Sequence, residues 1–451
     1  MKKVKLAKLL SILLSALLIV SFVAGCSSKD SGTSGDTSSG TTKETGSSDS
    51  GSSTSSSSSG EKEKVVLWYL WTGAEGEVVD SIAEDFNAQS DKYVVEPLSV
   101  PDMQKVMVAI SSGEGPDITD DFSSNVAPYA SKGIVEPLYD YIAKSNYDIS
   151  DFAEASFETC KWNGKIYALP IAANTDALFY NKTLLAEAGY TEPPKTMEEL
   201  MEMSIATTKT NPDGSIDVLG FPMFPSNSTD AFIIAWGGGW LNGTEMNADN
   251  PANLEALKYI IQYREKFGVD NVSAFQTAGK AHDPADPFFK GKQVFRISGA
   301  WLPTMIEKTF NVDIDYGICE IPYPADHPEL KGRTLINSST FYIPSTAKNK
   351  DGAWEFMAYI CGPEGQKKFS VGLGNIPTLK SLMNEDLYSK MPGSEFFGPY
   401  TINKNAVPNM SIPQGTEYST IVNEEVELAL NLKKSPEDAI KSIVERSKDL
   451  F

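Results

Sequence analysis

The chain has 451 residues, of which 41% are apolar, and its formal net charge is −21. An apolar content this high in a chain of this length can bury a large core, and the length predicts more than one domain. The strong acidity disfavours binding to nucleic acid and electrostatic docking on anionic lipid, because both of these partners are themselves negatively charged.

The first 25 residues, Met1–Gly25, have the composition of a secretory signal. Four lysines precede an apolar run from Leu9 to Val23, which is too short to indicate a membrane-spanning helix, and their removal would change the net charge from −21 to −25. The adjoining Val23-Ala24-Gly25-Cys26 resembles the bacterial lipobox, whose cysteine is lipidated and becomes the new N-terminus; the alternative is an ordinary signal followed by a chance cysteine. Several acyl chains on Cys26 would anchor the protein to a membrane, since one chain alone binds marginally.

Residues 26–64 comprise Cys26 and a segment made almost entirely of Ser, Gly, Thr and scattered charges. Such residues cannot form a core, so we expect a flexible tether here. The folded domain is therefore expected to cover residues 65–451.

Alternating strands and helices open this domain. Val65–Leu70 is a continuous apolar run of the kind that is buried on both faces of a parallel sheet. A helix follows, and a second strand covers Tyr93–Val100. Asp102 is placed to cap the next helix, and a third strand ends at Asp120-Asp121. The β-α-β-α-β order predicts an α/β lobe with a doubly wound parallel sheet, whose ligands bind at the carboxyl ends of the strands.

The stretch from Trp162 to Leu185 joins two structural patterns. Asn163-Gly164 favours the positive-φ pair of a two-residue hairpin turn between strand-forming residues. Small and polar residues from Ala172 to Asp176 then interrupt the apolar pattern before a strand resumes. A short crossing segment with hydrogen-bonding side chains between two structured units is typical of a hinge at the floor of a cleft.

This stretch also carries a family resemblance. The sequence NGKIYALP…ALFYNKTLLAEAGYTEPPKTMEEL resembles extracellular solute-binding proteins of ABC importers, in the mostly carbohydrate-binding, maltose-binding-protein-like branch, although Met197 stands where that branch usually has Trp. The segment from Phe288 to Trp301 is similar to a second motif of the branch, and further similarity extends over nearly all of residues 65–451. The resemblance implies an α/β, two-lobed periplasmic-binding-protein-like fold, in which each lobe is a doubly wound sheet flanked by helices around a ligand cleft.

The resemblance also implies a function and its partners. It predicts a monomeric, lipid-anchored receptor on the extracellular face of the bacterial cytoplasmic membrane, which captures a neutral sugar or oligosaccharide and delivers it to ABC transporter permease subunits. No cofactor, catalytic residue or metal is expected in such a receptor, and the lipid anchor is its only expected contact with the membrane.

We expect the chain to cross between the lobes three times, near Ala172–Asn174, Ile336–Ser339 and Gly374–Pro377. The second and third crossings are inferred from the resemblance. Lobe 1 would then contain residues 65–172 and 338–373, and lobe 2 would contain residues 174–336 and 376–451.

The loops expected to face the cleft have the composition of a sugar site. A sugar presents apolar C–H faces and many hydroxyls, which suit aromatic platforms and planar acceptors such as carboxylates and amides. Glycine-rich turns allow close backbone approach. Arg296 is the one arginine near these loops, so a phosphate or carboxylate ligand would lack a charge partner. The candidate ligand-binding residues are Trp71, Thr72, Glu75, Asp120, Asp121, Asn174, Asp176, Trp236, Trp240, Trp301 and Ser339.

The tryptophans differ in their expected roles. The resemblance places a stacking Trp at Trp301, which would otherwise begin a helix inside a core. Trp71 directly follows a strand, at the edge where ligands bind in such sheets. At least one of Trp236 and Trp240, which flank three glycines, should line the cleft. Two further tryptophans, in the middle of a strand and of a helix, are expected in the core: Trp68 and Trp354.

The polar candidates also have alternatives. Asn174 corresponds to a sugar-binding Glu of the family. The resemblance therefore implies a sugar-binding role for Asn174, with an amide in place of the carboxylate. Asp176 lies in the same crossing segment. Asp120 and Asp121 would fit a solvated turn, but two acids after Gly115-Pro116-Asp117 suit hydroxyl recognition, and at least one of them is expected to contact the ligand.

Two other functions remain open at this point. Acids and aromatics together would also bind a cation such as a polyamine. A cell-surface glycoside hydrolase would need two carboxylates about 5–10 Å apart, which Asp176 and one of Asp120 and Asp121 could supply. The two histidines, His282 and His327, lie in no recognisable catalytic or metal motif.

Metal and disulfide signals are weak. Residues 211–217 faintly resemble a calcium loop but lack its alternating ligands and its terminal Glu. Once Cys26 is lipidated, three cysteines remain without C-x-x-C spacing, and their odd number argues against a full disulfide framework. They are Cys160, Cys319 and Cys361.

Overall fold

The structure, a computed structural model, describes residues 61–221, 227–277, 279, 283–383, 391–395, 397, 405–409 and 411–451. All of them belong to one unit, residues 60–451. The predicted signal segment, Cys26, most of the tether and His282 lie outside the described residues. Within the described ranges, no helix is both long enough and apolar enough to span a bilayer.

The larger of two main sheets combines parallel and antiparallel strands. In order across the sheet these are β15 (Ile376–Pro377), β6 (Leu169–Asn174), β14 (Thr334–Tyr342), β3 (Ile118–Phe122), β1 (Glu63–Tyr69) and β2 (Tyr93–Ser99), with β16 (Ala406–Pro408) paired to β14. β1 is parallel to β2 and β3, as the β-α-β-α-β order predicts. β14 lies antiparallel between β3 and β6.

Helices cover both faces of this sheet. They are α2 (Gly73–Gln89), α3 (Met103–Ser112), α4 (Val126–Ser131), α5 (Tyr139–Ser145), α6 (Glu154–Glu158), α13 (Lys350–Ile360), α14 (Pro363–Leu373) and α15 (Lys380–Met383). Val65 and Leu67 of β1 face a core with α2, α13 and α14, whereas Trp68 packs toward a separate core with α3 and α4. Trp354 is buried in the first core, as predicted, whereas Trp68 is only partly buried where it packs against the second.

The second sheet is smaller, and its described strands are antiparallel. β7 (Asp176–Asn181) lies between β12 (Phe295–Gly299) and β13 (Tyr316–Cys319). The helices around it are α7 (Lys182–Glu187), α8 (Met197–Thr207), α9 (Asn227–Ala235), α10 (Pro251–Phe267), α11 (Val269–Thr277), α12 (Leu302–Thr304), α18 (Gly415–Leu430) and α19 (Pro436–Ser447). Short hairpins complete the fold: β4 (Lys161–Trp162) with β5 (Lys165–Ile166), β8 (Lys209–Thr210) with β9 (Ile216–Val218), and β10 (Leu241–Asn242) with β11 (Glu245–Met246).

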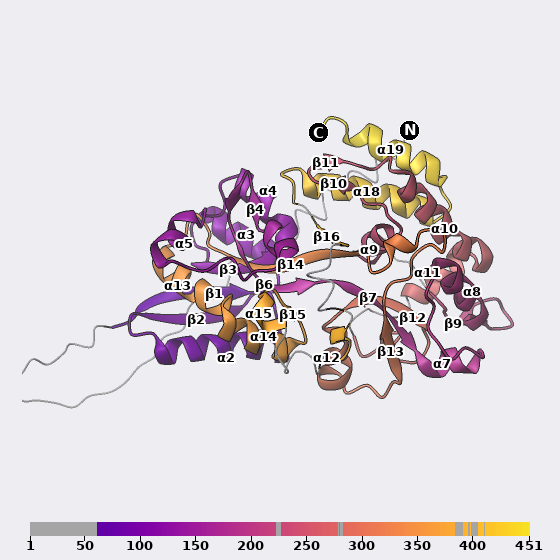
Figure 1. Cartoon of the computed structure of the whole chain (residues 1–451), viewed down its shortest axis with the longest axis horizontal. Coiled ribbons are helices and arrows are strands. Elements are labelled where there is room, and N and C mark those ends of the chain that lie inside the picture. Colours follow the sequence, from indigo (N-terminus) through magenta and orange to yellow (C-terminus); the bar gives the residue numbers. More distant parts are fainter. Residues whose placement is uncertain are drawn as a thin grey trace, which may run out of the picture. The chain divides into compact units, whose positions relative to one another are not determined.

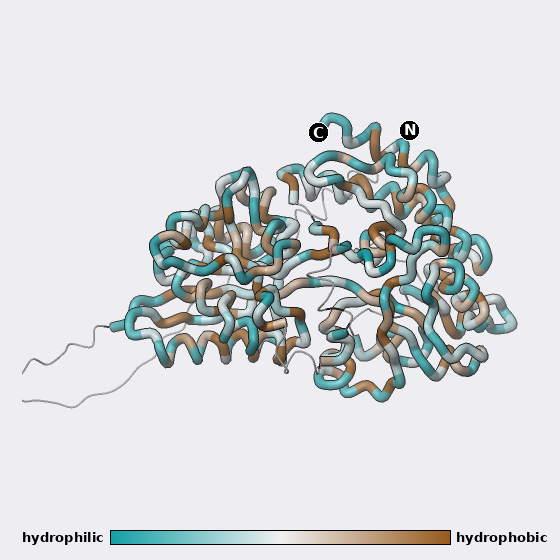
Figure 2. The backbone as a smooth tube through the Cα atoms, viewed as in Figure 1, coloured by the Kyte–Doolittle hydropathy of each residue, from teal (hydrophilic) through white to brown (hydrophobic). Residues whose placement is uncertain are grey.

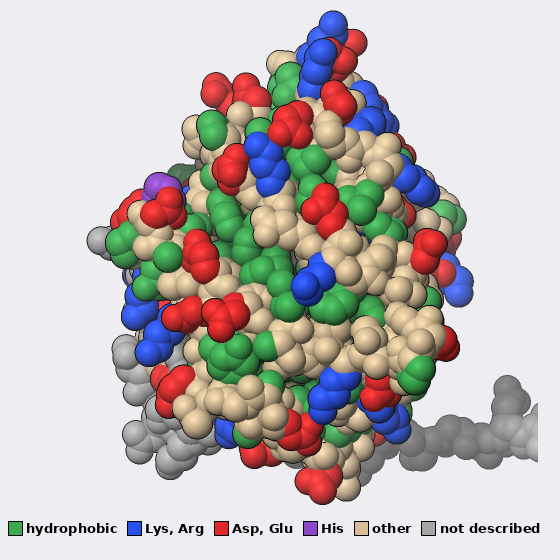
Figure 3. Space-filling view, turned by 90° about the vertical axis from the view of Figure 1, so that its right-hand side faces the viewer, with side chains coloured by type: hydrophobic (Ala, Val, Ile, Leu, Met, Phe, Trp, Pro, Cys, Tyr) green, Lys and Arg blue, Asp and Glu red, His purple; other side chains and the backbone are tan. Residues whose placement is uncertain are grey.

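Hydrophobic segments follow the strands and the inner sides of the helices, whereas many outer loops are hydrophilic (Figure 2). On the face shown in Figure 3, acidic and basic side chains are interspersed, with hydrophobic side chains between them. The net negative charge is therefore not spread as one uniform acidic surface on this face.

Local signals predict the element boundaries well. Asn163 and Gly164 have φ of 48° and 70° and form the hairpin turn between β4 and β5. Asp102 accepts hydrogen bonds from the first turn of α3, and Asn250 does so at α10. At α8, a complete capping box joins Thr196 to the third helical residue, as predicted.

The three predicted crossing segments lie side by side. Asn174 of β6 is opposite Asn337 of β14, and Ala173 is opposite both Ser338 of β14 and Ile376 of β15. β6 continues through Thr175 directly into β7, so the larger sheet leads into the smaller one. Figure 1 shows β14 and the β6–β7 segment passing between the two groups of elements.

Candidate ligand-binding site

A cavity of about 1730 Å³ opens between elements of both sheets. It is lined by the residues after β1, the β6–β7 junction, the turn after α9, the start of α12, one face of β14 and the first turns of α18. Its volume exceeds the ~300–1,000 Å³ of a typical small-ligand pocket, so it has room for a ligand of several rings.

β14 forms the floor of this cavity. Alternate residues of a strand point to the same face, and four such residues line the cavity: Arg333, immediately before the strand, then Leu335, Asn337 and Ser339. Asn174 Nδ2 donates to Ser339 Oγ at 3.1 Å. This hydrogen bond connects two of the predicted crossings at the cavity wall.

Two indoles line the cavity from the two sheets. Trp71 follows β1 and is 8% exposed; its ring lies 5.0 Å from Phe369 and 6.1 Å from Phe341. Trp301 follows β12, and its ring lies over Gly299, where a Cβ would be 1.9 Å from the nearest ring carbon. Only glycine permits this approach, so the sequence Gly-Ala-Trp positions the Trp301 ring against the strand.

A third indole, Trp240, is held by the glycine turn after α9. Its Nε1 donates to Asp230 at 2.8 Å, and its carbonyl accepts a hydrogen bond from Tyr418 of α18. The buried Asn253 of α10 accepts from the Gly239 amide and donates to three backbone carbonyls of the same region. The turn is thus fixed from α9, α10 and α18.

Four carboxylic acids line the cavity: Glu75, Asp176, Asp230 and Asp286. Burial raises the pKa of Asp176 to about 7, and the nearby Asp230 adds to this increase. Burial also raises the pKa of Asp230 to about 6, against the opposite effect of its hydrogen bond from Trp240. Burial raises the pKa of Glu75 as well. Hydroxyl groups of a ligand would supply the hydrogen bonds that water supplies to exposed carboxylates.

Seven of the predicted site residues meet at this cavity. They are Trp71, Glu75, Asn174, Asp176, Trp240, Trp301 and Ser339. The expectation that at least one of Trp236 and Trp240 lines the cleft is met by Trp240. Trp236 instead packs against Tyr259, with ring centroids 4.9 Å apart, and is not among the described lining residues.

Three further candidates do not line the cavity. Asp120 is fully buried and accepts from the Leu70 amide, and Asp121 accepts hydrogen bonds from Tyr129 and Asn125. The strand ends one residue later than predicted, at Phe122, so both acids lie within β3. Their carboxylates turn into the protein, where they hold β3 to its neighbours. Thr72 precedes the first turn of α2 and is exposed outside the lining.

Several cavity residues were not predicted. Phe122 is 42% exposed at the end of β3, and Asp230 lies one to two turns before the glycine turn. Arg333 is a second cavity arginine besides Arg296, whose guanidinium is paired with the buried Asp286. Arg333 lies three two-residue strand repeats before Ser339, so this alternation could have indicated it once β14 was known to face the cavity.

The described residues contain no group of three or more His, Cys, Asp and Glu side chains suited to a metal ion. The thiols of Cys160, Cys319 and Cys361 are unpaired, and burial raises the pKa of each. These cysteines are therefore poorly disposed to form thiolates.

Relatives by sequence bind small solutes. A maltotriose-binding protein of Pyrococcus abyssi is 27% identical over 341 residues, covering 74% of this chain and 71% of that relative. The sn-glycerol-3-phosphate-binding periplasmic protein UgpB of Shigella flexneri is 22% identical, covering 86% and 92% of the two chains.

Solved structures share the fold. CpMnBP1 with mannotriose bound superposes with a TM-score of 0.75 at 25% identity, covering 85% of this chain and 99% of that one. Lmo0181 of Listeria monocytogenes, in complex with cycloalternan, gives a TM-score of 0.73 at 20% identity, covering 86% and 99%. The family model described as bacterial extracellular solute-binding protein matches residues 81–395, well over half of the chain. The protein is therefore a member of the bacterial extracellular solute-binding protein family, with its two-lobed α/β fold.

Proposed function

We propose that this protein is the substrate-binding component of an ABC importer and captures a sugar or oligosaccharide between its two lobes. The observation that carries the proposal is the cavity itself, where three indoles and several carboxylate, amide and hydroxyl groups converge in a volume of about 1730 Å³. Indoles suit the apolar faces of sugar rings, and the polar groups suit their hydroxyls. The names of relatives that bind maltotriose or mannotriose support the same class of ligand.

Delivery to the permease would follow from tethering. The lipidated Cys26 and the residues up to 64 would hold the domain at the outer face of the cytoplasmic membrane, within reach of the permease subunits. Metabolic labelling with a fatty-acid probe tests the anchor: Cys26→Ala should abolish labelling and release the protein into the medium.

A thermal-shift screen tests the ligand class. A ligand that binds only the folded protein raises its stability by about 2.7 kcal/mol at a hundredfold excess over Kd. We expect stabilisation by mannotriose or maltotriose in a panel that also contains spermidine, amino acids and inorganic phosphate. Stabilisation by spermidine alone would replace the sugar with a cationic ligand.

Hydrolysis is the second function to test, because Asp176 and Asp230 both line the cavity. A hydrolase needs one acid protonated and the other ionised, in environments that separate their pKa values. Here burial raises both pKa values, to about 7 and about 6. We expect no new reducing ends after prolonged incubation with each stabilising oligosaccharide.

A further inference from the structure

Arg333 brings a guanidinium to the ligand cavity without an anionic partner among the described residues. Its Nε donates to the backbone carbonyl of Ile234 at 3.0 Å, at the carboxyl end of α9. For its two terminal nitrogens, no hydrogen bond or ion pair is found among the described residues. The side chain is half-buried at the edge of β14, and desolvation lowers its pKa.

The other cavity arginine shows what a satisfied side chain looks like here. Arg296 forms an ion pair with the buried Asp286. A half-buried charge without such a partner has lost part of its hydration and gained no protein counter-ion in return. Arg333 therefore remains able to bind an anion that enters the cavity.

We propose that Arg333 binds an oxyanion carried by the saccharide ligand, either the carboxylate of a uronic acid or a phosphate ester. The inference rests on the proposed sugar-binding function and extends the ligand class beyond neutral sugars. The two terminal nitrogens of a guanidinium form a fork that matches two oxygens of either group. The Nε bond to Ile234 fixes the plane of this fork before the ligand arrives.

The position of Arg333 on β14 orients the ligand. Arg333 and Ser339 are six residues apart on the same face of the strand, which corresponds to roughly 20 Å. Ser339 lies opposite Phe122, the last residue of the neighbouring strand β3. A ligand with its oxyanion at Arg333 therefore extends along β14 toward Trp71 and Phe122.

Two other roles for Arg333 give different expectations. A role confined to the carboxyl end of α9 would be structural, because cations stabilise helix C-termini through the same carbonyls. Alternatively, Arg333 would serve as a counter-charge to Asp176 and Asp230, which line the same cavity. Neither acid forms an ion pair with Arg333 among the described residues, and the pKa of Asp176 responds to burial and Asp230 instead.

Calorimetry with matched ligands tests the proposal. Wild type, Arg333→Gln and Lys331→Gln are titrated with trigalacturonate, its neutral galactotriose counterpart, glucose 6-phosphate and inorganic phosphate. Lys331→Gln removes the same charge two residues away, where the side chain is 63% exposed, pairs with Glu320 and does not line the cavity. We expect Arg333→Gln to weaken binding of the acidic saccharide about ten- to hundredfold, to leave neutral sugar within twofold, and Lys331→Gln to change neither.

The same experiment distinguishes the two kinds of oxyanion, because the anionic groups of trigalacturonate are all carboxylates and that of glucose 6-phosphate is a phosphate. If the neutral sugar binds and neither acidic ligand does, or if Arg333→Gln weakens neutral and acidic ligands equally, the proposal is overturned while the sugar receptor stands. If none of these saccharides binds, the proposal is overturned, and if the thermal-shift panel also shows no sugar binding, the proposed function itself fails.

The melting temperature of the ligand-free protein distinguishes a structural role of Arg333 from a role in ligand binding. Arg333→Met keeps the stem of the side chain and removes its charge. We expect the melting temperature of this variant to equal or exceed that of wild type, because an uncompensated charge leaves the cavity wall. A decrease of more than about 5 °C would assign Arg333 to capping α9 and overturn the proposal.

Discussion

The Trp301 ring lies against Gly299 and lines the cavity. Stacking on a sugar ring would bury about as much apolar area as a large side chain. Trp301→Ala should therefore weaken sugar binding by roughly 1.5–3 kcal/mol, or about ten- to two-hundredfold. Titration calorimetry measures this loss, and melting of the same variant should change little, because the ring is already partly solvated.

Gly299→Ala tests the position of the Trp301 ring without removing the ring. The added methyl group would meet three ring carbons of Trp301 at 1.9–2.4 Å, so the indole must move. This variant should lose affinity while it retains all the side chains that contact the ligand. A large decrease in melting temperature with unchanged affinity, in either variant, would instead place Trp301 in the core.

Asp176 gives the apo protein a characteristic pH dependence. Its pKa is raised to about 7 by burial and by Asp230, above the usual value of about 4. Between these values the folded state binds one more proton than the unfolded state, so this group makes stability fall as pH rises. Asp176→Asn should therefore raise the apo stability by about 1–3 kcal/mol at pH 8 and have little effect near pH 4.

Chemical denaturation at pH 4, 6 and 8 measures this change. If Asp176 accepts hydrogen bonds from the ligand, the same variant should also lose sugar affinity at pH 8. A stability difference that stays constant across the three pH values would show that Asp176 titrates as an ordinary solvated acid.

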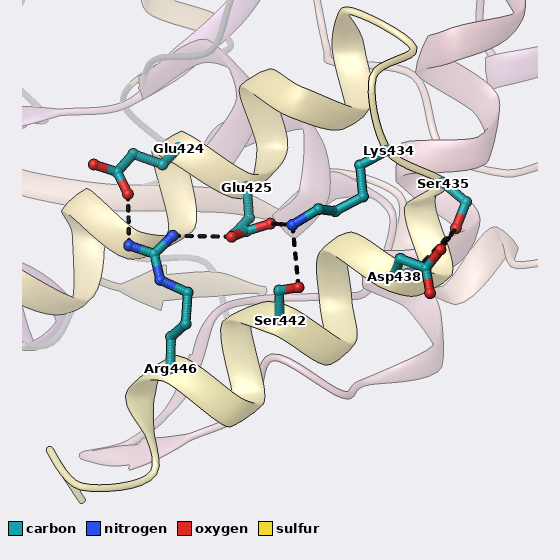
Figure 4. A network of polar contacts seen from close by, with 7 residues as sticks. All are labelled: Glu424, Glu425, Lys434, Ser435, Asp438, Ser442 and Arg446. Atoms are coloured by element: carbon teal, nitrogen blue, oxygen red, sulfur yellow. Dashed lines mark hydrogen bonds and ion pairs between the residues drawn. The ribbon is translucent and has the colours of Figure 1, made fainter.

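At the scale of elements, α18 and α19 are joined by a buried carboxylate. Glu425 accepts hydrogen bonds from Lys434 and Arg446, and Arg446 also contacts Glu424 (Figure 4). Burial alone would raise the pKa of Glu425, but the two cations outweigh it and lower the pKa. Since α18 also lines the cavity, this network supports one wall of the site.

Glu425→Gln should lower the free energy of unfolding by about 1.5–3 kcal/mol at pH 7, because two hydrogen bonds to charged donors lose their anion. The lowered pKa means that this stability is present above the ordinary glutamate pKa of about 4.3 and disappears as pH falls below it. Urea titrations at pH 7 and pH 3 check both statements. Glu424→Gln is the control: Glu424 is 54% exposed and contacts the same arginine, so it should contribute less than about 1 kcal/mol.

Sequence reasoning succeeded for elements with local causes. The turn at Asn163-Gly164 and the caps at Asp102 and Thr196 depend on residues a few positions apart, and all are confirmed. It failed where a side chain's direction depends on distant pairing. At least one of Asp120 and Asp121 was expected at the cavity, but the carboxylates accept hydrogen bonds from the Leu70 amide and from Tyr129, and neither acid lines the cavity.

The same limit explains what was missed in the site. The hydrogen bond from Trp240 to Asp230 could not be predicted from the spacing of the two residues in the sequence. It depends on the glycine turn that Asn253 of α10 holds in place. Arg333 was missed because its exposure to the cavity follows from the pairing of β14 with β6, across more than 150 residues of sequence.

At the scale of the whole molecule, the three crossing segments predict closure of the lobes around the ligand. β6 runs into β7, and β14 and β15 pair alongside it, so a rotation between the lobes would bend these neighbouring strands. We expect the radius of gyration from small-angle X-ray scattering to decrease when the stabilising sugar is added. Trp301→Ala at the same sugar concentration should remain open, and an unchanged radius for saturated wild type would contradict the hinge.

The central place of β14 also has a consequence for how the protein reaches its native state. Ser339 pairs with Phe122 on one side and with Ala172 on the other, so the first sheet receives a central strand that is synthesised more than 150 residues after its neighbours. Contacts between positions so distant in the chain slow folding, because a long loop must close before they form. A chain shortened to residues 61–333 would leave β3 and β6 with unpaired edges, and the first lobe can therefore complete its core only late in synthesis.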